Sequence, residues 1–275
     1  MSLEEVIFKP ARESLLEKQD GREKLIRSCR EITSYSKKAI FTLHRTLISQ
    51  QIVIKELTLY LEIMGEHLNT VKVIYMSNQS LRGSISGAIE EMIEFFTFGY
   101  YKYHGKLILY TEFVKSLNMV MEGNIPEVVA FILNKSELKY NSVEKEGKEV
   151  EKEVEGVEED DFKNVLVDQS DFLMGLFDCT GEIMRMVILQ STNNAGGLQM
   201  QHTLENYKFL KVLYEQYLIL QTRYPGISIH HGSFDDAIGL KGNFSFKKKL
   251  EVFQSSIKKI ETTLLDILIS DKEIL

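Results

Sequence analysis

Proline is almost absent from this chain, and its scarcity constrains the fold more than any other feature. Only Pro10, Pro126 and Pro225 occur among the 275 residues. Proline lacks a backbone donor and clashes with the preceding helical turn, so long proline-free stretches permit long helices. Apolar residues recur at spacings of three and four, without sustained strand-type alternation. We therefore expect an all-α fold with long helices packed as a bundle.

The apolar periodicity also predicts where the helices lie. They cover roughly residues 11–48, 53–76, 81–103, 170–190, 198–223 and 244–269, with shorter helices between 107 and 138 that break at 123–126. The first has its apolar face at Leu25, Cys29, Ile32, Ala39, Ile40, Leu43 and Leu47. Residues 193–197 and 225–242 are rich in turn formers, so we expect loops there.

An acidic segment interrupts this pattern. Residues 143–161 hold ten acids and three lysines, which account for the whole net charge of −7. Because such a segment cannot bury an apolar core, we predict that 141–161 is a disordered acidic loop inside one domain spanning 1–275. The rest of the chain is neutral, so the overall acidity does not exclude a nucleic-acid ligand.

Several protein classes find no support in the sequence. The charged N-terminus lacks an apolar signal region, and no run of about 18 apolar residues could span a membrane. Two cysteines, Cys29 and Cys179, without a short spacing motif indicate a reducing compartment. We expect an intracellular protein, cytoplasmic, nuclear or both, that is not secreted and has no membrane partner. The CxxC, HExxH, P-loop and GxSxG motifs are absent, which disfavours zinc hydrolases, NTPases and serine hydrolases.

The segment from Asp171 to Leu189 combines an apolar helix with a narrow polar stripe. At about 100° per residue, the stripe holds Asp171, Asp178, Glu182 and Arg185, bordered by Gly175 and Gly181. Most other positions are apolar, so we expect a buried helix whose stripe faces solvent or an internal cavity. Asp178 and Glu182 are one turn apart, and such carboxylates repel unless a cation lies between them. Both Arg185 and a divalent metal are candidates for that cation, and the glycines would leave room for a ligand.

A second carboxylate pair, Glu91 and Glu94, stands beside Glu90 on the segment predicted as a helix over 81–103. The pair is spaced by three and shares a face opposite the core-facing stripe. Carboxylate oxygens from two helices would suit Mg²⁺ or Mn²⁺. Ordinary solvated acids have the same spacing, however, and the spacing does not establish that the two helices touch.

Basic residues lie on the side of the first helix away from its apolar stripe. They are Arg27, Arg30, Lys37, Lys38, His44 and Arg45. Such a face could follow an RNA phosphate backbone, although a solvated helix face has the same pattern. The lysines of the last helix have the same two interpretations; they are Lys247, Lys248, Lys249, Lys258 and Lys259.

Two stretches resemble the translin-associated factor X branch of the translin family. Residues 30–45, REITSYSKKAIFTLHR, match its pattern of acidic–Ile-Thr, Ser-Lys-basic, Ile-Phe and Leu-His-Arg. Residues 171–186, DFLMGLFDCTGEIMRM, match its Asp-aromatic-Leu, Gly and Asp-x-Thr-Gly-Glu-x-Met-Arg-Met pattern. The order of the helices and the polar insertion also agree, whereas 50–76 and 202–242 diverge.

The resemblance implies a bundle of about seven helices that joins translin subunits in a closed hetero-oligomer of about eight chains. It further implies that single-stranded or partly paired RNA is cut inside, as in small-RNA passenger-strand or tRNA-fragment processing. The implied catalytic acids are Glu91, Glu94 and Asp178, helped by Glu182, and together they would hold Mg²⁺, or Mn²⁺ in its place. The alternatives are a non-catalytic scaffold subunit that binds single-stranded RNA or DNA, and a helical adaptor without nucleic acid.

Overall fold

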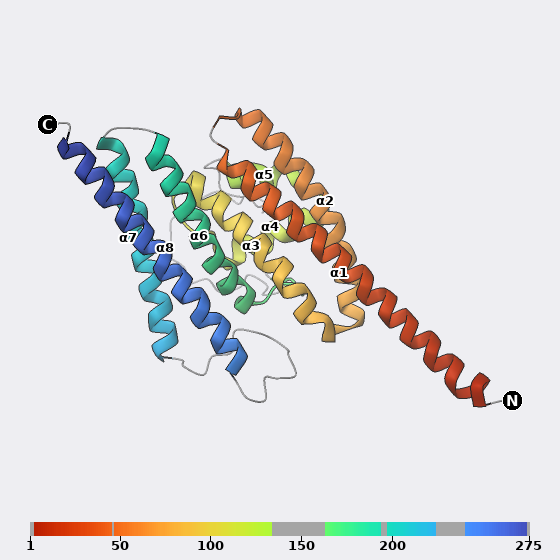
Figure 1. Ribbon diagram of the computed structural model, residues 1–275. Coiled ribbons are helices and arrows are strands. Elements are labelled where there is room, and N and C mark those ends of the chain that lie inside the picture. The colour runs from red at the N-terminus through yellow and green to blue at the C-terminus, as the bar shows by residue number, and fades with distance from the viewer. Residues whose placement is uncertain (1–2, 46, 134–162, 194–196, 224–239, 274–275) are drawn as a thin grey trace, which may run out of the picture.

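Eight α-helices make up nearly all of the chain that the computed structural model describes (Figure 1). The described residues are 3–45, 47–133, 163–193, 197–223 and 240–273. The helices are α1 (Lys9–His44), α2 (Gln50–Ser77), α3 (Arg82–His104), α4 (Tyr110–Glu122), α5 (Ile125–Leu133), α6 (Gln169–Asn193), α7 (Gly197–Arg223) and α8 (Leu240–Glu273). A π-helical turn, η1 (Glu4–Phe8), precedes α1, and a 3₁₀ turn, η2 (Gln79–Leu81), precedes α3. No strand occurs in the described part, so the all-α prediction is confirmed.

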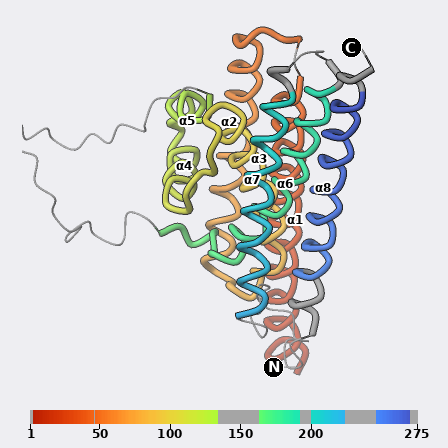
Figure 2. The backbone as a smooth tube through the Cα atoms, turned by 90° about the vertical axis from the view of Figure 1, so that its left-hand side faces the viewer, coloured from red at the N-terminus to blue at the C-terminus, as the bar shows by residue number. Residues whose placement is uncertain are grey.

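Four long helices form the layer that positions the site. α1 packs against α3, α3 against α6, and α6 against α8, which places α3 and α6 between α1 and α8. Figure 1 shows this order, with α2 against α1 and α7 against α8. α4 contacts α2, α5 contacts α2 and α3, and both lie to one side of the long helices in Figure 2.

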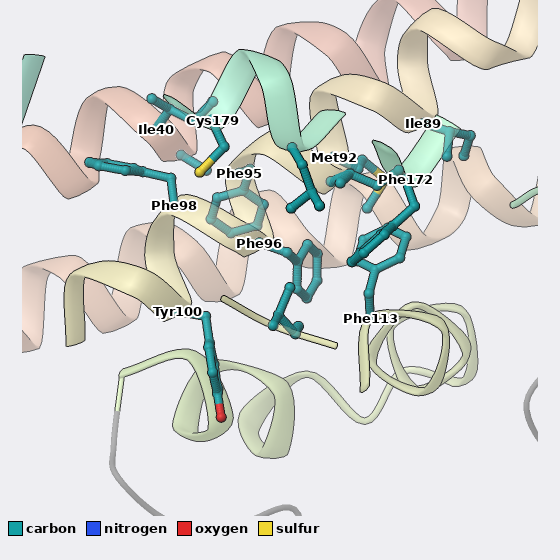
Figure 3. Close-up of a cluster of buried hydrophobic side chains, with 14 of the residues drawn as sticks. Ile40, Ile89, Met92, Phe95, Phe96, Phe98, Tyr100, Phe113, Phe172 and Cys179 are labelled. Carbon is teal, nitrogen blue, oxygen red and sulfur yellow. The ribbon is translucent and has the colours of Figure 1, made fainter. Parts of the chain in front are cut away.

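Aromatic residues of α3 form the centre of the core (Figure 3). Phe95, Phe96 and Phe98 are fully buried. The Phe96 ring lies edge-on to Phe113 of α4, with 5.5 Å between ring centroids, and Phe113 in turn contacts Phe172 of α6. Because buried aromatic rings radiate from successive positions of α3, this helix is central, and the acids one turn earlier sit at the edge of the core.

Local sequence signals set several helix ends. α3 and α4 end at Gly105 and Gly123, whose φ angles of 72° and 85° are in the left-handed region that glycine adopts without steric cost. The hydroxyl of Ser49 caps α2 by accepting a hydrogen bond from the Ile52 backbone amide at 3.4 Å.

The first helix ends earlier than its apolar pattern predicts. α1 stops at His44, and Leu47, expected on the buried face, is 98% exposed. The cap at Ser49 explains the break, because it starts a new helix where the periodicity alone suggests a continuing one. Near the other terminus α8 begins at Leu240, so 240–242 is helical where a loop was expected. The acidic loop expected at 141–161 lies outside the described residues.

The N-terminal part of α1 stands apart from the bundle. From residue 3 to residue 20 every side chain is exposed, and Figure 1 shows this end of α1 extending beyond the other helices. Among the described helices, none has the length and apolar character needed to cross a membrane.

Candidate functional site

A pocket of about 950 Å³ opens among α1, α3, α6 and α8. α1 and α8 flank it, and α3 and α6, which lie between them, form its base. Acidic, basic and apolar side chains all contribute to its lining. The charged residues are Lys37, His44, Glu91, Glu94, Asp178, Glu182, Arg185, Lys248 and Lys249, and the apolar ones are Ile40, Phe41, Phe177, Leu189 and Val252.

All four acids predicted from the sequence line this pocket. Glu91 and Glu94 come from α3, and Asp178 and Glu182 come from α6. Sequence spacing did not establish that the two helices meet, and the structure shows that their carboxylate pairs line a common pocket.

A glycine allows the two acid-bearing helices to approach closely. A Cβ atom at Gly175 of α6 would lie 2.6 Å from the Cβ of Ile93 and 2.8 Å from the backbone carbonyl oxygen of Glu90, both in α3. The expectation that Gly175 leaves room for a ligand is thus wrong, because the space is filled by α3. Gly181 differs, since it borders the pocket and a Cβ there would meet nothing within 4 Å.

Lys249 of α8 joins the acids of both base helices. Its ammonium group donates to Asp178 Oδ2 at 2.8 Å, to Glu90 Oε2 at 3.1 Å and to the Met174 backbone carbonyl at 3.2 Å. Burial lowers the pKa of Lys249, but the carboxylates of Asp178 and Glu90 outweigh it, and the pKa is raised overall. Lys249 is therefore a charged partner inside the site, so of the two interpretations given for the lysines of the last helix, a solvated face does not apply to it.

Glu91 is only partly neutralised. One of its oxygens, Oε1, lies 3.1 Å from the ammonium group of Lys37 on α1. Its other oxygen, Oε2, is buried without a hydrogen-bond partner. Burial raises the pKa of Glu91, and the hydrogen bond and charge of Lys37 oppose that rise. A buried acceptor without a donor is costly, which marks this oxygen as one that an added cation would satisfy.

Glu94 has no hydrogen-bond or ion-pair partner among the described residues. Burial, followed by repulsion from Asp178, Glu91 and Glu182, raises its pKa to about 8. A carboxyl group at this pKa is largely protonated at neutral pH when no cation is added. Such a shift at a cluster of carboxylates in a cleft is typical of functional sites.

Glu182 is held by residues from two helices. His44 Nε2 of α1 lies 2.5 Å from Glu182 Oε2, and Arg185 donates to the same oxygen at 3.1 Å. The His44 ring is also stacked on Phe98, with 4.5 Å between ring centroids. His44 therefore connects the end of α1 to α6 and sits at the inner edge of the pocket, not on the open basic face where its spacing placed it.

The remaining basic residues of α1 do not form one continuous face. Arg27, Arg30 and Lys38 are exposed, and the Lys38 ammonium group lies 4.0 Å from the centre of the Tyr35 ring. Arg45 instead turns toward α2, where it forms an ion pair with Glu56 and donates to Thr42. Lys37 alone of the five proposed RNA-binding residues lines the pocket.

Comparison with known proteins identifies the family. A model described as the translin family matches residues 20–271. The chain belongs to the translin family. Among its relatives, Translin-associated protein X from Pongo abelii is 25% identical over 272 residues, and that from Mus musculus is 24% identical over 270 residues. Each alignment covers 97% of this chain and 79% of the relative.

A solved structure agrees with the translin-family fold. The crystal structure of apo-NeC3PO superimposes with a TM-score of 0.57 at 13% sequence identity, covering 95% of this chain and 97% of that one. At this identity the likeness supports the fold, and the site rests on the residues described above.

The donor set of this translin-family pocket has the chemistry that a hard divalent cation requires. Its acids offer only oxygen ligands, and Mg²⁺ and Mn²⁺ prefer carboxylates supplemented by water. The unsatisfied Glu91 Oε2 and the unpaired Glu94 are free acceptors at the same place. As arranged here, however, no three His, Cys, Asp or Glu side chains of the described residues converge closely enough to hold one ion. Two of the acids, Glu91 and Asp178, are paired with lysines instead.

Sequence reasoning missed two of the residues that organise the pocket. Glu90 was noted only as a neighbour of the pair, yet it shares Lys249 with Asp178. In the sequence, Lys249 is one of three consecutive lysines, and it was not set apart from the other two. A signal was present, because Lys249 is three residues after Phe246 and four before Phe253, two buried positions of α8. This spacing places it on the buried stripe.

Proposed function

We propose that this translin-family chain is the catalytic subunit of an endoribonuclease complex. It would cut single-stranded or partly paired RNA with Mg²⁺, or with Mn²⁺ in its place. The observation that supports this most directly is that Glu91, Glu94, Asp178 and Glu182, from two separate segments of the sequence, line one pocket. Ion pairs alone do not require this arrangement, because Glu94 has no counter-ion of its own among the described residues.

The partners we propose are translin subunits in a closed hetero-oligomer of about eight chains. Family membership and the C3PO-like fold support a multi-subunit assembly of the translin type. The substrate would be of the kind met in small-RNA passenger-strand or tRNA-fragment processing, and the location would be the cytoplasm, the nucleus or both.

The residues suggest a division of roles within the pocket. Glu91, Glu94 and Asp178, helped by Glu182, would hold the metal once they lie closer together than in the arrangement described above. The chemistry that Mg²⁺ supplies when bound is polarisation of the phosphodiester and a lower pKa for the attacking water. Glu94, which has no paired cation among the described residues, would accept the proton of that water in its ionised form, which is the form that a bound cation favours.

Binding of the RNA backbone would fall to the cations at the edge of the pocket. Lys37 and Lys248 are exposed and line it from opposite sides, on α1 and α8. Contacts of this kind weaken as salt rises, and they carry no sequence information. We therefore expect cleavage with slight sequence preference. Attack by water should leave a 5′-phosphate and a 3′-hydroxyl, and a 2′,3′-cyclic phosphate product would contradict this route.

A second candidate function is supported by the ion pairs themselves. Asp178 is paired with Lys249, Glu91 with Lys37, and Glu182 with Arg185 and His44. If these pairs are permanent, the acids stabilise the bundle, and the chain is a non-catalytic scaffold subunit that binds single-stranded RNA or DNA.

Cleavage of a labelled single-stranded RNA separates the two functions. The chain is co-purified with its translin partner and assayed with Mg²⁺ and with EDTA, beside Asp178→Asn. We expect cutting that needs Mg²⁺ and falls by at least about a hundredfold in the variant, the scale of losing one group that stabilises the transition state.

The matched control is Asp266→Asn, an exposed aspartate of α8 that does not line the pocket. It should cut RNA like the unmodified complex. Undiminished cutting by Asp178→Asn would place catalysis on another subunit and leave this chain as the scaffold.

A further inference from the structure

Three apolar side chains are exposed at the pocket, each from a different helix. Phe41 of α1 is 68% exposed, and Val252 of α8 and Leu189 of α6 are also exposed. Neither metal binding nor phosphate binding uses an apolar surface. A pocket of about 950 Å³ is also in the size range that takes a whole organic ligand rather than an ion.

Phe41 is positioned by its helix to face outward. Its neighbours Ile40, Thr42 and Leu43 are buried, so α1 is anchored on either side of Phe41 while the phenyl ring remains in solvent. The guanidinium of Arg45, one turn later, lies 5.9 Å from the ring centre and is itself fixed by its ion pair with Glu56. The ring is thus presented from a rigid element, which limits the entropy lost when a ligand stacks on it.

Cations alternate with these apolar residues around the pocket. Lys37 precedes Phe41 by one turn of α1, and Lys248 precedes Val252 by one turn of α8. Exposed aromatic rings interleaved with basic side chains are what a single-stranded nucleic acid requires, because its bases stack while its phosphates are neutralised. The core of a protein–protein interface, by contrast, is depleted of lysine.

We propose that Phe41 is a stacking platform for an unpaired nucleobase of the RNA strand held in the pocket. This inference rests on the proposed function, and it adds a reason for choosing unpaired RNA. A base must leave its duplex stack before it can lie on the ring, so a fully paired strand cannot use the platform. Stacking tolerates any base, which keeps sequence preference slight.

The absence of tryptophan from the chain makes a direct test available. Phe41→Trp creates a single tryptophan, and labelling it with fluorotryptophan gives a fluorine signal that can be followed in the chain alone and in the complex with unlabelled partner. The probe is a single-stranded oligoribonucleotide in a buffer that contains Ca²⁺. Its effect is compared with that of an abasic oligomer of the same length and number of phosphates. We expect base-bearing RNA to shift the fluorine resonance and quench the chain's tryptophan emission, and the abasic oligomer to leave both nearly unchanged.

Phe8→Trp is the matched control, because Phe8 is the same residue type, is 67% exposed and lies in η1 away from the pocket. Its signal should not respond to RNA. As a second readout, Phe41→Ala should weaken binding of base-bearing RNA roughly tenfold and leave binding of the abasic oligomer unchanged.

The outcomes separate this inference from the nuclease proposal. Equal responses to the two oligomers, or none, would overturn the platform even if the complex cuts RNA normally. A shift on adding the partner, with no further change on adding RNA, would assign Phe41 to a subunit interface and also overturn it. If base-bearing RNA alone gives a response but the complex cuts no RNA, the stacking role of Phe41 is supported and the proposed nuclease activity is contradicted.

Discussion

The two ends of the polar stripe on α6 carry aspartates in opposite situations. Asp171, near the start of the helix, is 3% exposed and fully bonded. It pairs with Arg82, and it accepts hydrogen bonds from the Ser86 hydroxyl at 2.7 Å and the Asp168 backbone amide at 3.0 Å. Asp178, two turns later, faces the pocket and shares its ion-pair partner, Lys249, with Glu90.

The difference separates a carboxylate whose bonding is complete from the one that the proposed function uses. Around Asp171 the charge is balanced, because Arg82 and Ser86 of α3 and the backbone amide of Asp168, just before α6, supply its donors. No acceptor site is then left for a ligand. Around Asp178 the neighbouring acids include a buried oxygen without a donor and a glutamate with a pKa of about 8. One end of the stripe therefore stabilises the contact between α3 and α6, and the other lies beside acceptors that an added cation could satisfy.

The largest expected loss of stability comes from changing Asp171, the aspartate whose hydrogen bonds are complete. Asp171→Asn leaves Arg82 buried beside a neutral amide, and removing one partner of a buried ion pair costs about 3–5 kcal/mol of unfolding free energy. Asp178→Asn should cost less than about 1 kcal/mol, because its side chain is more exposed and its partner keeps Glu90. Urea unfolding in EDTA, followed by circular dichroism, measures both values.

Equal losses of stability in the two variants would reverse this interpretation. Asp178 would then be as structural as Asp171, and the scaffold function would be favoured over the nuclease. Ser86→Ala removes one donor to Asp171, together with a longer hydrogen bond of 3.2 Å to Glu90, and should cost about 1 kcal/mol at a residue that does not itself line the pocket.

Much of this arrangement could be predicted from the sequence, because periodicity reports which face of a helix is buried. The apolar stripe of α1 from Leu25 to Leu43 and the nearly all-round burial of α6 were both predictable. The break at His44 was not, because it depends on a cap at Ser49 that competes with a continuing apolar pattern.

Spacing identified the four acids and named Arg185, which pairs with Glu182, but it did not identify the partners that come from other helices. Spacing places Asp178 and Glu182 on one face, yet the choice of counter-ion depends on which helices pack together. Lys249 is 71 residues from Asp178, and His44 is 138 residues from Glu182. Such contacts are fixed by tertiary packing, and the same long-range packing turns Arg45 toward Glu56 and away from the predicted basic face.

Glu94, the pocket acid without an ion-pair partner among the described residues, should make the stability of the chain depend on pH. The pKa of Glu94 rises from its ordinary 4.5 to about 8 in the folded chain, so between these values the folded state binds more protons than the unfolded state. Stability in EDTA should therefore fall as pH rises through this window, by on the order of a few kcal/mol. The raised pKa values of Glu91 and Asp178 act in the same direction.

Glu94→Gln should flatten this dependence, because glutamine cannot ionise. The measurement is the urea-unfolding free energy of both proteins across the window, with Glu66→Gln, an exposed glutamate of α2, as the control that keeps the slope. Saturating Mg²⁺ should also reduce the decline in the unmodified chain, since a bound cation favours the ionised carboxylate. An unchanged slope in Glu94→Gln would mean that this carboxyl is not the group that titrates.

A smaller effect than that of Asp171→Asn is expected at the glycines that border the same stripe. Gly175→Ala places a methyl group against Ile93 and the Glu90 carbonyl, so α3 and α6 must separate, and overpacking of this kind costs about 1–3 kcal/mol. Gly181→Ala meets no atom within 4 Å and should instead gain up to about 1 kcal/mol of helix propensity. The separation in Gly175→Ala also moves Glu91 and Glu94 away from Asp178 and Glu182, so its affinity for Mn²⁺, measured by calorimetry, should fall even at temperatures where it is fully folded. If Gly175→Ala is destabilised but binds Mn²⁺ as tightly as the unmodified chain, the metal does not need acids from both helices. The close packing of α3 against α6 would then contribute to stability alone.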